Sequence, residues 1–125
     1  MPAVHASAVL WCRDRVAIPS VETADTFASR ALGLMGRAPL GAGRAIYLSP
    51  CRAIHTCFMR FALDLVFVDR AMRVVQIVRG VRPWRTASGG RAAHGGLELE
   101  AGWLGAEALR EGDAVELRER EKKDV

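Results

Sequence analysis

The chain has 125 residues and a formal net charge of +4 at neutral pH. A chain of this length can bury one core without disulfides or a metal ion, so we expect a single domain over residues 1–125, with a core at about 8–117 and a charged tail at 118–125. Its three cysteines are an odd number without a CxxC pair, which excludes a complete secreted-type disulfide framework. No apolar run approaches the roughly 20 residues of a membrane span, and the apolar start lacks the basic flank of a signal peptide. These features predict a cytoplasmic protein that does not associate with a membrane.

The positive charge is carried almost wholly by arginine, and it is unevenly distributed. Residues 70–97 contain no acid, whereas residues 98–124 hold most of the carboxylates. The basic stretch carries Arg70, Arg73, Arg79, Arg82, Arg85 and Arg91. Such a stretch suits phosphate contacts, but the acidic C-terminal part and the modest net charge argue against nucleic acid as a partner.

The first half of the chain predicts a helix among strands. Residues 8–18 favour an opening strand or hairpin, and Thr26 can cap a helix over residues 27–36, whose apolar side chains form one stripe. A short apolar run at 45–48, bounded by Ser49 and Pro50, is typical of a buried strand.

The second half predicts a central hairpin followed by shorter elements. Residues 63–68 and 74–78 are apolar on both faces, which marks them as central strands joined by a short hairpin turn. The glycines and proline between 82 and 96 predict a long loop. We then expect a short segment at 97–99, a short helix at 103–110, a turn at Gly112 and Asp113, and a last strand at 114–117.

Five motifs in this order resemble one known family. They are ADTFASRALGLMGR, IHTCFMRFALDLVFVD, RPWR, LELEAG and EGDAVEL. Over about residues 24–117 the chain is similar to the uncharacterised ACR family, the domain of unknown function 192. The resemblance implies a small, β-rich α+β domain with a curled, barrel-like, mainly antiparallel sheet and one or two short helices, and no established activity.

The chain departs from the family pattern at three positions. Met72 stands where members commonly have a turn glycine, Ala62 where many have proline, and Gly36 where many have phenylalanine. A methionine at positive φ would be strained, so the type of the hairpin turn is left open.

One group of reactive residues suggests a thiol-dependent enzyme. Cys51 and His55 lie close in sequence, and an imidazole that lowers the pKa of a thiol is the usual way to make a cysteine nucleophilic. Asp64 can orient such a histidine as the third member of a triad. Asp64 also lies within an apolar strand, where a buried carboxylate needs a partner such as Arg60 or His55.

The same region contains residue types that bind zinc. Cys51, His55, Cys57 and His94 are suitable ligands, but their spacing matches no paired knuckle. No glycine-rich phosphate loop is present either. We therefore predict neither a metal nor a cofactor.

A second group of residues suggests binding rather than catalysis. Guanidinium forks match carboxylate and phosphate geometry, and an indole ring offers a stacking face. The predicted ligand-binding residues are Arg60, Arg82, Trp84 and Arg85. The favoured hypothesis is a binding or accessory module for a small anionic ligand or a protein partner, with the Cys51 and His55 enzyme as the alternative. The sequence leaves open whether the protein is an enzyme, and it does not give the oligomeric state.

Overall fold

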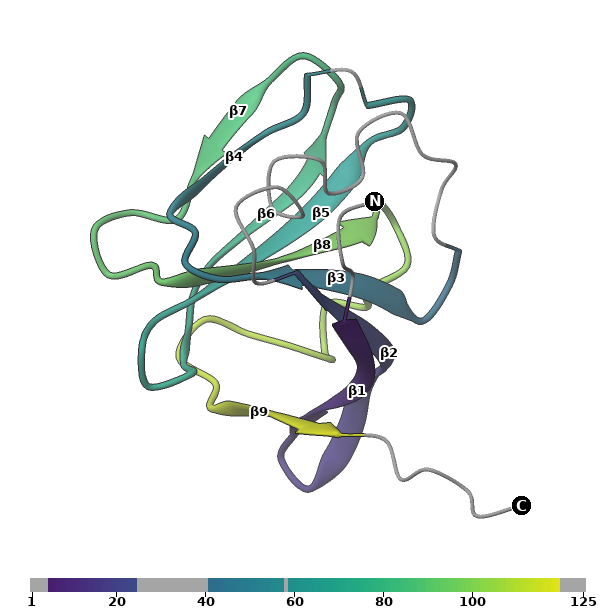
Figure 1. Ribbon diagram of the computed structural model, residues 1–125, viewed down its shortest axis with the longest axis vertical. Coiled ribbons are helices and arrows are strands. Elements are labelled where there is room, and N and C mark those ends of the chain that lie inside the picture. The colour runs from purple at the N-terminus through teal and green to yellow at the C-terminus, as the bar shows by residue number, and fades with distance from the viewer. Residues whose placement is uncertain (1–4, 25–40, 58, 120–125) are drawn as a thin grey trace.

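The computed structural model describes residues 5–24, 41–57 and 59–119, and this part of the chain is built from β-strands. Seven strands form one curled sheet in the order β6-β5-β8-β3-β2-β1-β9, and β4 and β7 form a separate two-stranded ribbon (Figure 1). The strands are β1 His5–Cys12, β2 Arg15–Ala24, β3 Arg44–Leu48, β4 Ala53–His55, β5 Leu63–Val68, β6 Val74–Val81, β7 Thr86–Ser88, β8 Gly95–Glu100 and β9 Val115–Glu119. The sheet is mainly antiparallel, with β2 and β3 as its parallel pair. The described ranges contain no helix, and therefore none that is long and apolar enough to cross a membrane.

The large sheet curls into a half-barrel whose two edge strands approach each other at one end. An isolated bridge pairs Arg73, just before β6, with Ala114, just before β9. The bridge is reinforced by hydrogen bonds from Val115 N to the Met72 carbonyl (2.8 Å) and from Val74 N to the Asp113 carbonyl (2.8 Å). The expected curled, barrel-like sheet is therefore confirmed.

Both faces of the central strands are buried, because the sheet separates two apolar clusters. Side chains alternate between faces along a strand. In β5, Val66 and Val68 join the cluster inside the half-barrel, whereas Leu65 and Phe67 join a second cluster. Ile54 of the β4–β7 ribbon packs in this second cluster, so the ribbon covers the outer face of the sheet. This double burial explains why β5 is an uninterrupted apolar run apart from Asp64.

Of the two predicted helices, only one falls within the residues that the structure describes. The helix at 27–36 lies outside the described residues. The helix at 103–110 is wrong, since this segment forms turns. Its two buried leucines, Leu104 and Leu109, are five residues apart, which does not match the three- or four-residue spacing of a helical stripe. Arg79 Nη1 instead donates to the Leu104 carbonyl (2.6 Å).

Most predicted strands are confirmed, with two changes of position. The opening hairpin and the strands at 45–48, 63–68, 74–78 and 114–117 are present. However, β6 is an edge strand of the large sheet rather than a central one, and its middle residues are only partly buried. The predicted tail begins too early, because β9 continues to Glu119 and Arg118 lies over the Trp11 ring, 4.4 Å from its centroid.

The predicted loop at 82–96 is also partly wrong. It contains β7, and Gly95 and Gly96 begin β8 instead of ending a loop. The glycines allow a close approach of other side chains: a Cβ on Gly95 would lie 2.3 Å from the Tyr47 hydroxyl, and one on Gly89 would lie 2.4 Å from the Phe67 ring. The glycines here permit packing rather than marking turns.

Met72 lies in the turn between β5 and β6, at the position where the family commonly has glycine. Its φ is +59°, so this position has the left-handed conformation that glycine adopts most easily. Met72 packs against the cluster inside the half-barrel and accepts a hydrogen bond from the Tyr47 hydroxyl (3.7 Å). Side-chain burial thus offsets part of the strain at this turn.

Candidate functional site

A buried threonine organises the loop that joins β6 to β7. Thr56 has no exposed surface, and its hydroxyl donates to the Arg82 carbonyl (2.6 Å) and accepts from Arg85 N (2.8 Å). Its backbone N–H donates to the Arg85 carbonyl (2.7 Å), and its carbonyl accepts from Trp84 N (3.0 Å). Because these bonds hold both ends of the tetrapeptide, the conformation of residues 82–85 is fixed.

This fixed loop presents Trp84 to solvent. The side chain is 58% exposed, and the residue has a φ of +63°, in the left-handed region. A non-glycine residue in this region costs on the order of 1–2 kcal/mol. More than half of the side chain stays exposed in this conformation.

Two of the predicted ligand-binding arginines face one hollow. Arg82 and Arg85, together with Arg79, line a hollow of about 470 Å³ between β6 and β7. Arg60 and Trp84 are not among its lining residues, although Trp84 lies between the two arginines in the chain. In the described part of the protein, the Arg82 guanidinium has no hydrogen-bond or ion-pair partner, whereas Arg85 Nη1 donates to the Trp84 carbonyl (3.3 Å).

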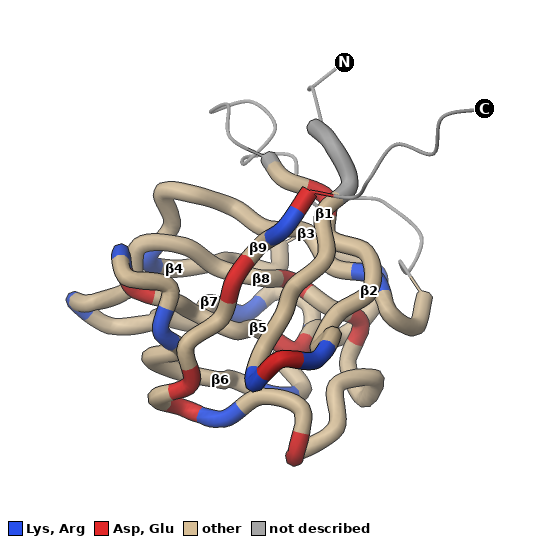
Figure 2. Tube along the Cα trace, turned by 90° about the horizontal axis from the view of Figure 1, so that it is seen from below, with Lys and Arg blue, Asp and Glu red and all other residues tan. Residues whose placement is uncertain are grey.

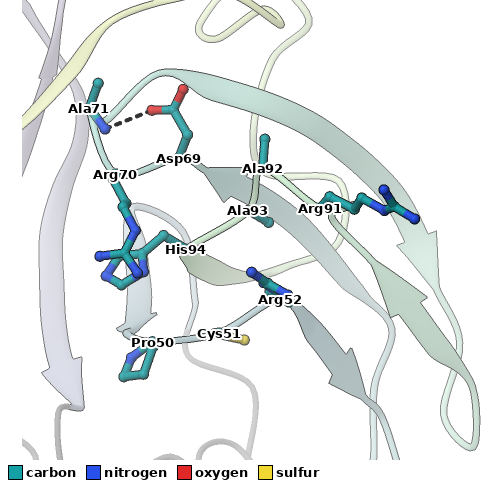
Figure 3. A pocket seen from close by; sticks show the side chains of 10 residues that line it. All are labelled: Pro50, Cys51, Arg52, Asp69, Arg70, Ala71, Arg91, Ala92, Ala93 and His94. Atoms are coloured by element: carbon teal, nitrogen blue, oxygen red, sulfur yellow. Dashed lines mark hydrogen bonds between the residues drawn. The ribbon is translucent and has the colours of Figure 1, made fainter.

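A second, larger hollow lies at the opposite end of the β4–β7 ribbon. The ribbon runs from the pair His55 and Thr86, next to the first hollow, to the pair Ala53 and Ser88. Beyond that second pair, three chain segments enclose a space of about 800 Å³ (Figure 3). The lining residues are Pro50, Cys51, Arg52, Asp69, Arg70, Ala71, Arg91, Ala92, Ala93 and His94.

The predicted catalytic residues do not assemble into a triad. The Cys51 thiol donates to the Ala53 carbonyl (3.3 Å), and His55 is exposed on β4. Asp64 lies on the face of β5 that lines the half-barrel, whereas β4 packs on the other face through Ile54. The sheet therefore separates Asp64 from the strand that carries His55.

Asp64 is buried as predicted, but its partners differ from those expected. Its carboxylate accepts hydrogen bonds from Gly80 N (2.8 Å) and Gly102 N (3.1 Å), and Arg79 Nη1 lies 3.8 Å away. Neither Arg60 nor His55 is among these contacts. The carboxylate therefore joins β5 to the end of β6 and to the turn after β8.

The cysteines and histidines do not form a metal centre in the described part of the chain. There, no three His, Cys, Asp or Glu side chains lie close enough together to hold an ion. His94 lies beside Cys51 through the backbone, since Cys51 N donates to the His94 carbonyl (2.7 Å). His55 occupies the far end of the ribbon from this pair.

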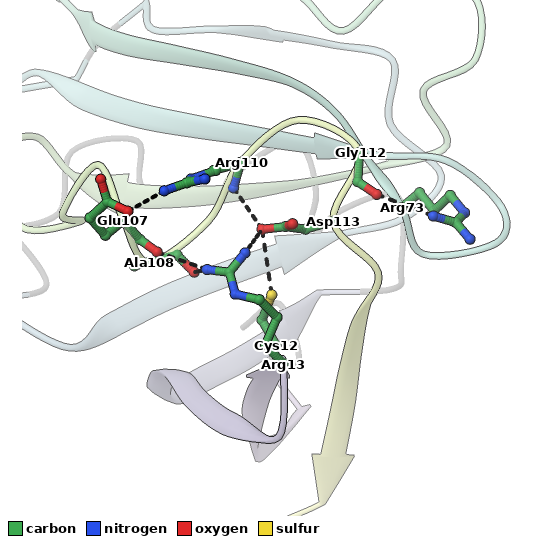
Figure 4. Close-up of polar contacts among 8 residues, drawn as sticks. All are labelled: Cys12, Arg13, Arg73, Glu107, Ala108, Arg110, Gly112 and Asp113. Atoms are coloured by element: carbon green, nitrogen blue, oxygen red, sulfur yellow. Dashed lines mark hydrogen bonds and ion pairs between the residues drawn. The ribbon is translucent and has the colours of Figure 1, made fainter.

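A third polar cluster joins the β1–β2 turn to the segment before β9 (Figure 4). Asp113 Oδ2 accepts from Arg13 Nη1 (2.7 Å), Arg110 N (2.8 Å) and Cys12 Sγ (3.5 Å). Burial alone would raise the pKa of the Asp113 carboxyl, but hydrogen bonds from Arg110 N and Cys12, together with the charge and hydrogen bond of Arg13, outweigh it, so this pKa lies below its ordinary value. Burial, with the nearby Asp113 charge, raises the pKa of the Cys12 thiol. These shifts fit a structural clasp rather than a reactive thiol.

Sequence reasoning missed Thr56 as an organising residue, and it missed Arg52 as a lining residue. Arg70, Arg79 and Arg91 belong to the acid-free stretch, but nothing in the sequence assigns them to two hollows. Figure 2 shows the basic positions spread over several loops and strand ends rather than along one stripe.

Taken together, the curled sheet, its covering ribbon and the two arginine-lined hollows define a small β-rich domain. The chain belongs to the family of uncharacterized ACR proteins, the domain of unknown function 192, which it matches over residues 10–117. The resemblance seen in the sequence is therefore confirmed, and the matched region extends further toward the N-terminus.

Relatives with similar sequences are UPF0127 proteins of archaea. The chain is 35% identical over 102 residues to one from Pyrococcus abyssi, covering 77% of this chain and 84% of that protein. It is 37% identical over 70 residues to one from Pyrococcus horikoshii, covering 52% of this chain and 58% of that protein.

Two solved structures share the fold. A protein of unknown function from Novosphingobium aromaticivorans superposes with a TM-score of 0.76 at 25% identity, over 93% of this chain and 92% of that one. A protein of Sinorhizobium meliloti, described as a candidate transcription regulator, has a TM-score of 0.77 at 20% identity, over 92% of this chain and 96% of that one. This second likeness concerns the fold alone.

Proposed function

We propose that this protein is a binding module that takes a small anionic ligand at the loop formed by residues 82–85. The observation that carries the proposal is the loop itself, which buried Thr56 fixes at both ends while Trp84 stays exposed at a φ of +63°. Strained backbone conformations of this kind cluster at functional sites in proteins. A ligand that stacks on the indole would account for the left-handed conformation of Trp84.

The chemistry of the neighbouring side chains supports an anion as this ligand. Arg82 and Arg85 face one hollow, and in the described residues the Arg82 guanidinium has no acceptor. A guanidinium fork binds carboxylate or phosphate through two parallel hydrogen bonds. Because Thr56 fixes the backbone that carries both arginines, ordering of this backbone adds little to the cost of binding.

The test is a fluorescence titration with phenyl phosphate, which combines an aromatic ring with a phosphate group. We expect saturable quenching that is lost in Trp84→Phe, because that variant removes the reporting indole and leaves Trp11 and Trp103. Arg82→Gln and Arg85→Gln should each weaken binding about tenfold, which corresponds to the loss of one charge-assisted contact of about 1.4 kcal/mol.

Arg15→Gln is the matched control, since it removes the same charge from an exposed residue at the start of β2. It should leave the affinity unchanged. Quenching that does not saturate, or equal affinities in the Arg85→Gln and Arg15→Gln proteins, would overturn the proposal.

One observation favours a protein partner as a second candidate. Tryptophan and arginine are the residues most enriched at binding hot spots, and Trp84 is the most exposed large hydrophobic side chain in the described part of the chain. A partner with an acidic segment would engage the same loop. A short poly-glutamate peptide that binds in a Trp84- and Arg85-dependent manner, where phenyl phosphate does not, would favour this candidate.

A further inference from the structure

We propose that the larger hollow, at the opposite end of the β4–β7 ribbon, is a separate binding site for a small organic molecule with two or more negative charges. Its position makes it independent of the loop at 82–85. The ribbon pair Ala53 and Ser88 lies at this end, and the Gly89 N–H donates to the Arg52 carbonyl (2.8 Å), so the ribbon continues directly into the wall of the hollow.

The walls of the hollow are held by backbone hydrogen bonds between segments that are distant in sequence. Cys51 N donates to the His94 carbonyl (2.7 Å), and His94 N donates to the Val68 carbonyl (2.8 Å). Asp69 Oδ1 accepts from Ala71 N and Arg73 N, both at 2.9 Å, which closes the turn on the third side. Three segments are thereby fixed around one space, as in a largely preformed ligand site.

The charge around this space is positive and unsatisfied. Among residues 5–24, 41–57 and 59–119, none offers a hydrogen-bond or ion-pair acceptor to the guanidinium groups of Arg52, Arg70 or Arg91. The one acid in the lining, Asp69, directs one of its oxygens to two backbone N–H groups. Three guanidinium groups against one carboxylate leave an excess that a multiply charged anion would neutralise.

Part of the lining of the hollow is apolar and made of small residues. Ala71, Ala92, Ala93 and Pro50 line it, and Ala93 is almost fully buried. Small side chains leave the space open, and its volume of about 800 Å³ is within the range of small-molecule sites. An apolar lining beside charged groups suits an organic body that carries anionic groups, rather than a free inorganic ion.

Figure 3 indicates which arginines matter most. In this view Arg52 lies below Ala93 and Arg70 is drawn over His94, whereas Arg91 extends away from the other labelled side chains. Arg52 and Arg70 are therefore placed to contact a ligand in the hollow. Arg91 is placed to contribute mainly long-range attraction, which salt screens.

The experiment uses isothermal titration calorimetry at physiological ionic strength with two probes, phenyl phosphate and citrate, on protein that carries Arg82→Gln and Arg85→Gln, so that the loop at 82–85 contributes little heat. Phosphate esters and polycarboxylates share the required charge, and the two probes distinguish between them. We expect saturable binding of one or both probes. Arg52→Gln and Arg70→Gln should each weaken it at least tenfold, Arg91→Gln should weaken it less, and Arg15→Gln should leave it unchanged.

A second readout locates the ligand and separates this proposal from the preceding one. Cys51 lines the hollow and is partly exposed, and Cys57 is partly exposed but does not line it. Bound probe should slow the alkylation of Cys51 by iodoacetamide and leave the alkylation of Cys57 unaffected. Mass spectrometry of the peptides measures both rates. This protection should persist in Arg82→Gln and Arg85→Gln. Loss of protection in those two variants, absence of saturable heat with both probes, or an equal effect of Arg15→Gln would overturn the inference.

Discussion

Removing the carboxylate of Asp64 is the most informative perturbation of the scaffold. In Asp64→Ala, the N–H groups of Gly80 and Gly102 lose their acceptor. A donor left without its partner costs about 1–3 kcal/mol. Both glycines are exposed, so water entering the vacated space restores part of the hydrogen bonding and places each loss near the lower limit. The ion pair with Arg79 adds little, because that side chain is 41% exposed.

We therefore expect Asp64→Ala to lower the free energy of unfolding by about 2–3 kcal/mol, measured by urea denaturation. Asp64→Asn should show a smaller loss, because its amide oxygen can still accept from Gly80 N while its NH₂ group faces the Gly102 donor.

Asp69 provides a matched control for this reasoning. Its carboxylate also accepts two backbone N–H groups, but the residue is only partly buried. Water can replace these contacts, so Asp69→Ala should cost less than about 1 kcal/mol. Equal losses for Asp64→Ala and Asp69→Ala, or an Asp64→Ala protein as stable as the parent, would refute the argument that burial decides the size of the effect.

Three further predictions concern the core, the hairpin turn and acid stability. Val66 has no exposed surface, so Val66→Asp should abolish the cooperative melting transition. The control Val16→Asp, at an exposed position, should leave the transition intact. Met72→Gly should relieve about 1 kcal/mol of strain but lose more through packing, giving a net loss of about 1–2 kcal/mol in urea denaturation. The folded-state pKa of Asp113 is lowered, so its contribution to stability is present above the unfolded value of about 3.9 and is lost as pH falls through the folded value. Asp113→Asn should thus flatten the dependence of unfolding free energy on pH below about 4, and an unchanged slope would contradict this assignment.

The strands were predictable because they depend on local patterns. The run at 63–68 is apolar on both faces, and the structure buries it between two clusters. The same reasoning failed for β6, whose apolar sequence at 74–78 suggested a central position. Its neighbour on one side is β5, and on the other side, within the described residues, only the bridge at Arg73 approaches another strand. An apolar sequence indicates that a strand is buried, but it does not indicate whether neighbouring strands or other segments bury it.

The error at 103–110 has a different physical cause. The apolar residues there suggested a helix, but the segment instead follows the open side of the half-barrel and inserts Leu104 and Leu109. Side chains from elsewhere satisfy its carbonyls, since Arg13 Nη2 donates to the Glu107 carbonyl (2.8 Å) and Arg79 Nη1 to that of Leu104. Partners so distant in sequence leave no periodic signal, so local propensity could not reveal this arrangement.

The candidate sites show the same division between local chemistry and distant assembly. The motif RPWR contains two arginines and an indole, but the residue that fixes its backbone is Thr56, which lies 26 residues before Arg82. At the larger hollow, Arg52 and Arg70 come from segments that meet only because β5 and the ribbon pack on each other. A threonine in a strand-like segment is ordinarily a packing residue, and its role here is visible only once the loop at 82–85 is in place. The short ribbon thus has one consequence for function: by crossing the outer face of the sheet, it sets a rigid, arginine-bearing loop at one end and a preformed basic hollow at the other. Because the two ends share no lining residue, a change at one should leave binding at the other intact.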